Sequence, residues 1–498
     1  MTTQPQLKRG QVGLLGVMMP GLAQVGPAFN ILFTVGLVAS LVGESTPLFY
    51  LIGMLGIAAT ANTFAQFSRK YSTSGSFLAF ISRGLGAPVA VVAGVMALLG
   101  YIIAFGGIYI FVGQYITQNL LGNPHVHGID VIVTVVFGAL VTVPAILGLS
   151  TGVRTSIVLY VIEVVILLTF IIGVIARGGA HGLSASPFTL EGVTSAKSIG
   201  LALSLTILAF SGFEAAAPLA EETSRPRRNV PIALMVNVLV SGILYVGGSY
   251  ALVIAFGTDH TAALASDPSP FQTAAKLLVP VVAGLVVWVF LTSITSSYVA
   301  ANLETSRVIY AGARGGLWWK SLGRIHPKFG TPWVAAVAFV APSVVIGAVS
   351  PVFTDPVTAS GFLGTLGTLG VVVMYAVTNL ALAVAWVRDR RSGERGHVVT
   401  QFLLPLVGIA VLIVPVWGDL QPGQAAPYKY LPWCTIALAA VAVVYMLGLR
   451  TRKPEVMAHA TELLVGEVVD TETDLDGNGG SDTMDSATGG SARALSVQ

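Results

Sequence analysis

Two apolar stretches of the 498-residue chain combine helix-breaking residues with an isolated polar side chain. Residues 16–27 contain two Pro/Gly pairs on either side of Gln24, and residues 207–214 contain a Ser-Gly pair that closely precedes Glu214. Proline and glycine interrupt helices, and an interrupted helix exposes backbone groups that can bind a ligand. Both stretches are therefore candidate binding segments.

The backbone groups freed at the two breaks suit a zwitterion. Freed amides near Gly21 to Gly26 would bind a carboxylate, helped by the helix dipole. Freed carbonyls at Leu208, Ala209 and Phe210 would accept hydrogen bonds from an ammonium group. Together they predict a site for an amino acid or a related compound.

Ionisable residues within the apolar stretches are few, and each costs a few kcal/mol unless it is paired or hydrated. Glu214 follows the second break and Glu163 lies in the middle of another apolar stretch. We predict proton coupling or gating for Glu214 ahead of Glu163. Glu304 and Arg307, one helical turn apart, are expected to form a structural pair.

Neither the cysteine nor the histidines point to an enzyme. Cys434 is the single cysteine, and all seven histidines fall in predicted connections or in the tail. A zinc-dependent intramembrane enzyme would need ligands at the reaction site. We therefore predict no enzyme activity, no metal site and no cofactor.

The composition is that of an integral membrane protein. Hydrophobic residues make up 54% and charged residues 10%, whereas soluble domains carry about 25% charged residues. The 56 glycines favour helices that approach one another closely in lipid. The expected partners are the lipid bilayer and a small molecule, without nucleic acid, and the oligomeric state stays open.

Apolar runs of about 20 residues are long enough to cross the bilayer as helices. We predict an all-α membrane protein with twelve spans, near residues 13–42, 46–66, 87–121, 130–149, 153–177, 198–222, 231–256, 278–306, 332–350, 357–387, 402–417 and 431–449.

The distribution of basic residues predicts the orientation in the cell (plasma) membrane. With the N-terminus inside, 21 of the 26 Lys and Arg residues fall on the cytoplasmic side and four on the other, with Arg493 in the tail. Positive charge is retained in short cytoplasmic loops, so both termini are expected to be cytoplasmic. Residues 450–498 are acidic and rich in Gly, Ser and Thr, which predicts a disordered tail.

The breaks fall in spans 1 and 6, which are equivalent positions if two five-helix repeats enter the membrane from opposite sides. This organisation gives a cytoplasmic N-terminus at 1–12, a first repeat at 13–177 and a second, inverted repeat at 198–387. Two additional spans at 402–449 precede the tail. Paired interrupted helices are a sequence indication of a transport site.

Residues 210–231 read FSGFEAAAPLAEETSRPRRNVP. This stretch resembles the span 6 signature of the amino acid, polyamine and organocation (APC) transporter superfamily. Residues 306–332 resemble the family's connection between spans 8 and 9, and residues 75–86 match the loop between spans 2 and 3 more loosely. The resemblance runs from about residue 10 to 450.

The resemblance implies a LeuT-type fold, with a 5+5 inverted repeat plus two C-terminal helices, and alternating-access transport of amino acids or amines. By motif position it implies substrate contacts at Gly21, Leu22, Ala23, Gln24, Leu208, Phe210, Ser211 and Gly212. It implies coupling or gating at Glu214, Glu163, Ser296 and Ser297, of which Ser297 matches the family's span 8 hydroxyl.

The sequence departs from the family pattern at three places. Span 1 has Pro20-Gly21-Leu22 in place of the usual Gly-Ser-Gly, and Gly315 replaces a common acidic residue. The third departure is that no lysine occurs between Lys70 and Lys197, although many relatives have one in span 5. The coupling ion, H⁺ or Na⁺, therefore stays open, with H⁺ favoured.

The apolar surroundings of Met18, Met19, Leu22 and Leu208 favour an amino acid with a neutral or apolar side chain. A polyamine or another organic amine is the alternative substrate class, because Glu214 could pair with it. A membrane receptor that senses an amino acid without transporting it is the alternative from another class. A major-facilitator carrier is disfavoured, because the connection between spans 6 and 7 is short.

Overall fold

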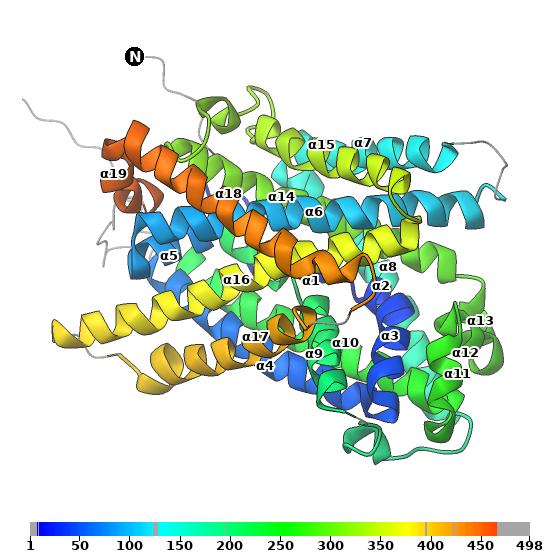
Figure 1. The fold of residues 1–498 in the computed structure, drawn as a ribbon. Helices are drawn as coiled ribbons and strands as arrows, with labels where there is room; N and C mark the ends of the chain where they lie inside the picture. Colours follow the sequence, from blue (N-terminus) through cyan, green and yellow to red (C-terminus); the bar gives the residue numbers. More distant parts are fainter. Residues whose placement is uncertain are drawn as a thin grey trace, which may run out of the picture. The chain divides into compact units, whose positions relative to one another are not determined.

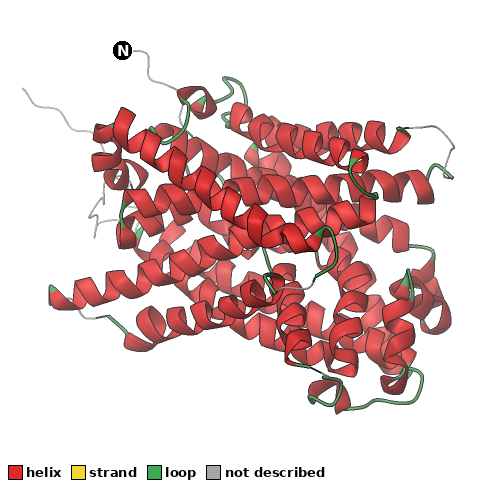
Figure 2. Cartoon of the chain, in the orientation of Figure 1, coloured by secondary structure: helices red, strands yellow, loops and turns green. Residues whose placement is uncertain are grey.

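The computed structural model of the chain describes residues 7, 9–122, 128–193, 195–393, 396–421 and 424–465. These residues form helices and their connections, without a β-sheet among them (Figure 2). The longer helices, labelled in Figure 1, are α1 (Leu14–Val25), α3 (Val35–Val42), α4 (Thr46–Lys70), α5 (Phe77–Leu85), α6 (Ala87–Asn119), α7 (Ile129–Leu147), α8 (Leu149–Ala176), α9 (Ala196–Ala209), α10 (Pro226–Phe256), α14 (Val286–Arg314), α15 (Trp333–Val349), α16 (Pro356–Arg391), α17 (Leu404–Asp419), α18 (Leu431–Arg452) and α19 (Pro454–Val465). Shorter elements are α2 (Pro27–Phe29), a π-helical turn Asn30–Thr34, the 3-10 helix η4 (Phe213–Glu222), α11 (Thr261–Ser266), α12 (Pro270–Leu278) and α13 (Pro280–Ala283).

Eleven helical runs of this part of the chain are long and apolar enough to cross a membrane. The first two predicted spans fall in one run, Leu14–Lys70, which is 57 residues long. This run is not one straight helix, because α3 ends at Val42 and Gly43–Ser45 form a 3-10 turn before α4 begins. The prediction of an all-helical membrane protein is confirmed, and the count of twelve spans stays a prediction.

The eighth predicted span, 278–306, is displaced in the structure. The short helices α12 and α13 occupy its beginning, and α14 extends eight residues beyond its predicted end to Arg314. The charged residue Arg307 does not end the helix, because its buried guanidinium is paired with Glu222.

The longest helices approach one another closely at small residues. α16 packs along α6, and α10 packs along α4. A Cβ atom on Gly100 of α6 would lie 2.5 Å from the carbonyl oxygen of Gly367 on α16. Only glycine permits this backbone contact, as the glycine content suggested.

A packed helix lies where the sequence predicted the beginning of a disordered tail. In α19, Ala460 and Leu464 are buried, and α19 packs on α5. The Thr73 hydroxyl donates to the Leu464 carbonyl at 2.5 Å. The acidic composition of the whole tail obscured this short apolar face, and residues 466–498 lie outside the described part of the chain.

Candidate substrate site

The first membrane helix is interrupted at Gly26. This residue has φ 58° and ψ 61°, a left-handed conformation that glycine adopts without strain, and it separates α1 from α2. Residues 21–24, which were expected to expose free amides, lie inside the continuous helix α1 and are buried. The break therefore falls at the end of the predicted range Gly21 to Gly26, because the left-handed glycine ends the helix, whereas Pro20 lies within it.

The amides that follow the break are held by a carboxylate and a hydroxyl. The Ala28 N–H donates to Glu163 Oε1 at 2.6 Å, and the Phe29 N–H donates to Ser293 Oγ at 3.1 Å. Ser293 Oγ in turn donates to the same Glu163 oxygen at 2.8 Å. Glu163 is fully buried, and α8 thereby places a carboxyl group at the helix N-terminus that follows the break.

The two serines expected at the coupling position have different partners. Ser297 Oγ of α14 donates to the Gln24 carbonyl of α1 at 2.7 Å. Ser296 Oγ instead donates to the Ser293 carbonyl of its own helix at 2.9 Å. Of this pair, only Ser297 bonds to the first span, and Ser293 lies one turn before it.

The predicted interruption of the sixth span is present. α9 ends at Ala209, Gly212 has φ 105°, and η4 begins at Phe213. The hydroxyl oxygen of Tyr245 on α10 lies 2.6 Å from the Ala209 carbonyl and 3.0 Å from the Val25 carbonyl. One buried side chain therefore links the two breaks through the carbonyl groups that each break frees.

The other carbonyls predicted for an ammonium group also have partners. The Leu208 carbonyl accepts from the Ser211 N–H at 2.9 Å, and the Phe210 carbonyl accepts from the Phe213 N–H at 3.3 Å. The Leu208 side chain is half-buried, and the Phe210 ring packs edge-on against Tyr245 with centroids 5.0 Å apart. Each carbonyl retains a second lone pair for a ligand.

Glu214 joins the second break to two further helices. Its Oε1 accepts hydrogen bonds from the hydroxyls of Tyr101 on α6 and Tyr375 on α16, the latter at 2.6 Å. Its Oε2 accepts from the Gly212 N–H at 3.0 Å. The carboxyl group is fully buried, so a change in its charge would disturb three elements together.

Two glycines predicted to contact substrate lie close to protein side chains in this structure. A Cβ atom on Gly212 would lie 2.5 Å from Gln24 Cγ, and one on Gly21 would collide with the Asn237 side chain. Asn237 Nδ2 donates to the Phe213 carbonyl at 3.1 Å. These glycines allow α1 to pack tightly against η4 and α10.

Leu22 and Ala23 belong to a small apolar cluster with Met19, Tyr160 and Ala300. The cluster joins α1 to α8 and α14. Both assigned residues therefore contribute to helix packing in this structure.

Buried polar atoms without a hydrogen-bond partner gather around α1. Such atoms are uncommon in folded proteins. In the described part of the chain they include Gln24 Oε1, Tyr160 OH, Asn237 Oδ1, both polar atoms of Asn302 and both carboxylate oxygens of Glu304. The helices α8, α10 and α14 that carry them all pack on α1, so unused hydrogen-bonding capacity is concentrated beside this helix.

The end of η4 is tied to α14 by two ion pairs. Arg307 Nε lies 2.7 Å from Glu222 Oε2, and both side chains are almost fully buried. Arg314 Nη2 lies 2.5 Å from Glu221 Oε1 in a more exposed position. The predicted pair of Arg307 with Glu304 is wrong, because η4 brings Glu222 to the guanidinium.

Five aromatic rings form a cluster at the second half of the first span. Phe29, Phe33, Phe111, Tyr115 and Phe290 have ring centroids 4.0 to 6.4 Å apart. They come from α2, the π-helical turn, α6 and α14. This aromatic cluster lies directly beyond the break and offers an apolar surface.

Sequence reasoning missed several residues that hold the breaks together. These are Asn30, Tyr101, Tyr245, Ser293 and Tyr375. A polar group inside an apolar stretch was the available signal, since burial requires it to find a partner. The identity of each partner depends on helices distant in sequence.

Comparisons with known proteins agree with these features. Residues 16–418 match the family model described as amino acid permease. The chain is 26% identical to the low-affinity putrescine importer PlaP of Escherichia coli K12, over 89% of this chain and 95% of that protein. It is 27% identical to the branched-chain amino acid permease BcaP of Bacillus subtilis, over 89% and 94%.

A methylthioribose transporter of Bacillus subtilis is 25% identical, over 74% of this chain and 78% of that protein. All three relatives are named as proteins that move small molecules. The family model covers most of the chain, including both interrupted spans. With its many membrane-spanning helices, the chain belongs to the amino acid permease family of the APC superfamily, a family of membrane transporters.

Proposed function

We propose that this protein is a secondary active transporter for amino acids with a neutral or apolar side chain, working by alternating access and driven by protons. The observation that carries the proposal is the pair of interrupted helices linked by Tyr245, with Glu163 accepting a hydrogen bond from the Ala28 amide beyond the first break. The twelve-span count, the inverted five-helix repeats and the cytoplasmic position of both termini belong to the same proposal.

The substrate would lie between the two breaks. Its carboxylate would bind the amides of Ala28 and Phe29, which form the N-terminus of the second half of span 1. Its ammonium group would bind the backbone at Phe210 and Ser211 and the unpartnered Gln24 Oε1. Gly21, Leu22, Ala23, Leu208 and Gly212 would shape the site through packing.

The aromatic cluster supports an apolar substrate side chain. Its members surround α2, so a branched or aromatic side chain that extends from a carboxylate at Ala28 would be buried against them. A diamine would need carboxylates at both ends, and this cluster contains none. The relative named as a branched-chain amino acid permease supports an amino acid with an apolar side chain as the substrate. The relative named as a putrescine importer supports the polyamine alternative.

Glu163 is the residue that we assign to proton coupling. An ionised Glu163 accepts from the Ala28 amide and the Ser293 hydroxyl, so it occupies the position that a substrate carboxylate would take. Protonation removes the negative charge of Glu163 and weakens its hydrogen bonds with these two donors. A proton on Glu163 and a substrate carboxylate on Ala28 would therefore favour each other, which is the condition for symport.

Glu214 would act as a gate. Its carboxylate holds the break at Gly212 against Tyr101 and Tyr375, so movement of η4 during the transport cycle must change these hydrogen bonds. The two ion pairs between η4 and α14 would open in the inward-facing state.

The experiment is uptake into proteoliposomes with separate pH and sodium gradients, for leucine, phenylalanine and putrescine. Wild type should accumulate leucine or phenylalanine with a pH gradient, and Glu163→Gln should lose accumulation while retaining exchange of internal for external substrate. Glu44→Gln, a carboxylate hydrogen-bonded to Ser186 away from the breaks, is the matched control. Accumulation of putrescine alone would establish the polyamine alternative.

Sodium-driven uptake that survives Glu163→Gln would refute proton coupling and place the cation near Ser297. Loss of pH-driven accumulation in Glu214→Gln with retention in Glu163→Gln would transfer the proton to Glu214. Binding of an amino acid without any uptake or exchange would support the alternative of a membrane receptor that senses an amino acid without transporting it.

A further inference from the structure

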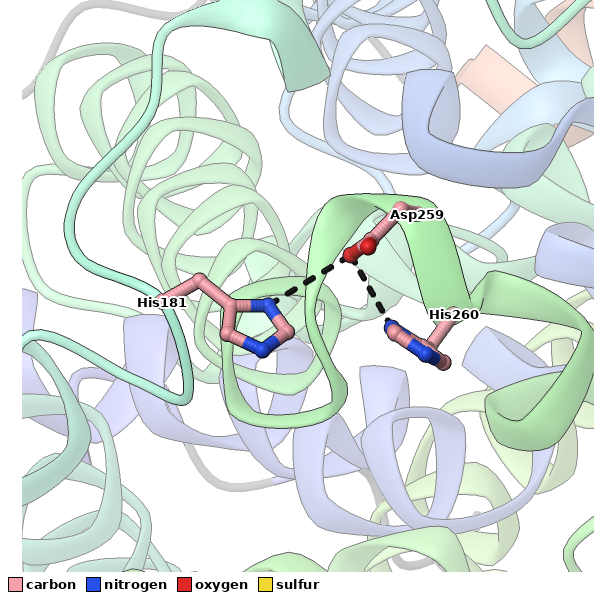
Figure 3. A group of neighbouring side chains, drawn as sticks. All are labelled: His181, Asp259 and His260. Carbon is pink, nitrogen blue, oxygen red and sulfur yellow. Dashed lines mark ion pairs between the residues drawn. The ribbon is translucent and has the colours of Figure 1, made fainter.

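Two histidines and an aspartate meet on connections outside the helices that carry the candidate substrate site. Figure 3 shows His181 and His260 on either side of Asp259, with both imidazoles directed at its carboxylate. The Asp259 Oδ1 atom lies 3.4 Å from His181 Nδ1 and 3.0 Å from His260 Nδ1. One potential ligand atom from each residue lies within 4.8 Å of the others.

The cluster joins two connections that are distant in sequence. His181 follows α8, whereas Asp259 and His260 lie in the 3-10 turn between α10 and α11. The Ala180 N–H donates to the Ile254 carbonyl at 2.9 Å, which fixes the two backbones beside each other.

Gly257 provides the room for the cluster. Its φ is 97°, and a Cβ atom there would lie 2.8 Å from His181 Nδ1 and 3.1 Å from Asp259 Oδ1. The glycine therefore lets His181 approach the turn.

The distances fit a tetrahedral transition-metal site. Zinc bonds histidine nitrogen and carboxylate oxygen at about 2.0–2.2 Å, and two ligand atoms at tetrahedral positions are then roughly 3.3–3.5 Å apart. The observed nitrogen–oxygen distances of 3.0 and 3.4 Å lie close to this value. All three ligand atoms lie within 4.8 Å of one another, so binding of one ion would draw the two imidazoles together.

The three side chains are open to solvent, with 60%, 67% and 59% of their surfaces exposed for His181, Asp259 and His260. An ion can therefore reach them without opening the protein, and water would complete its coordination.

We propose that His181, Asp259 and His260 form a binding site for a divalent transition metal of the zinc type. Two imidazoles and one carboxylate suit Zn²⁺, and they disfavour Mg²⁺ and Ca²⁺, which prefer oxygen ligands. A bound ion would clamp the connection after α8 to the turn before α11. α11 packs on α3, so the clamp would extend to the second half of the first span. In the predicted orientation the site faces the outside of the cell.

The test is zinc titration of the purified full chain in detergent by calorimetry, with any polyhistidine tag removed. His125→Ala/His127→Ala serves as the background, since these two histidines lie outside the described residues and are close together in sequence. The background should bind one Zn²⁺ per chain. His181→Ala, Asp259→Asn and His260→Ala added to it should each weaken binding by at least about tenfold, since even indirect partners of a metal contribute 10–100-fold.

His459→Ala is the matched control, because His459 is an exposed histidine on α19, and Figure 1 shows α19 far from α11. It should leave zinc affinity unchanged. Thermal unfolding without zinc should be the same in all variants, since the replaced side chains are exposed. Cobalt(II) bound to the background protein should give the intense visible absorption of a tetrahedral complex.

Absence of zinc binding in the background would overturn the proposal. So would unchanged affinity in His181→Ala or His260→Ala, because the ion would then be bound elsewhere. An octahedral cobalt spectrum would refute the tetrahedral ligand set. These outcomes do not depend on transport, so they leave the proposed function untouched.

Discussion

The buried ion pair between Arg307 and Glu222 predicts that the contact of η4 with α14 contributes strongly to the stability of the fold. Arg307 has no exposed surface and Glu222 has 2%, and their closest atoms are 2.7 Å apart. Glu222→Gln keeps the size of the side chain but leaves a buried guanidinium without a counter-charge. Breaking a buried pair in this way costs about 3–5 kcal/mol.

A loss of that size changes the folding equilibrium by a factor of roughly 100 to 4,000. The neighbouring pair of Arg314 with Glu221 is the internal control, because its side chains are 40% and 19% exposed. Glu221→Gln should cost less, on the order of 1 kcal/mol, because the Arg314 guanidinium is 40% exposed and solvent screens its charge. The two substitutions are chemically identical and lie one residue apart, so burial is the main difference between them.

The assay is unfolding in a mild detergent, followed by tryptophan fluorescence against temperature and denaturant. Glu222→Gln should unfold at a much lower temperature and denaturant concentration than Glu221→Gln. The double variant Glu222→Leu/Arg307→Met should recover most of the stability that Glu222→Gln loses. This recovery is expected because replacing a whole buried pair by apolar residues is often neutral. Equal stabilities of Glu222→Gln and Glu221→Gln would refute the reasoning, and so would a double variant less stable than Glu222→Gln.

Three further predictions concern the breaks and the cluster. Tyr245→Phe should weaken substrate binding by about 10-fold or more, because the Ala209 carbonyl loses its nearest donor at about 1–3 kcal/mol, whereas the Val25 carbonyl keeps the Asn30 amide. Tyr50→Phe, whose hydroxyl has no partner, should bind normally in a scintillation proximity assay. Gly212→Ala should lower the melting temperature and abolish substrate binding, since its Cβ atom would lie 2.5 Å from a Gln24 side-chain carbon at a backbone φ of 105°. Gly448→Ala should change neither property, because its Cβ atom would have no neighbour within 4 Å. Zinc added outside proteoliposomes should slow amino acid uptake by wild type and not by His260→Ala. Equal inhibition of both proteins would show that zinc does not slow transport through this cluster.

Much of the architecture follows from local sequence. A run of apolar residues must span the bilayer, and its position can be read directly because a helix satisfies its own backbone in lipid. Thus an all-helical membrane protein and the interruption before Glu214 were predicted correctly. The motif at residues 210–231 also indicated the family, which the comparison over residues 16–418 established.

Other features could not be read from the sequence, because they depend on which helices become neighbours. Gly26 and the earlier Pro20-Gly21 pair look equally able to break a helix, and only the folded chain puts Gly26 in the left-handed conformation. Arg307 has a carboxylate one turn away in Glu304, yet the tertiary structure supplies Glu222 in its place.

Glu163 shows the division most clearly. Sequence alone determined that a carboxylate lies in an apolar span, where it needs donors or a counter-charge. The fold decided that its donors are the amide of Ala28, 135 residues earlier, and the hydroxyl of Ser293, 130 residues later. The physical reason is that hydropathy and helix breaks are local properties, whereas the partner of a buried polar group depends on the packing of α8 against α1 and α14.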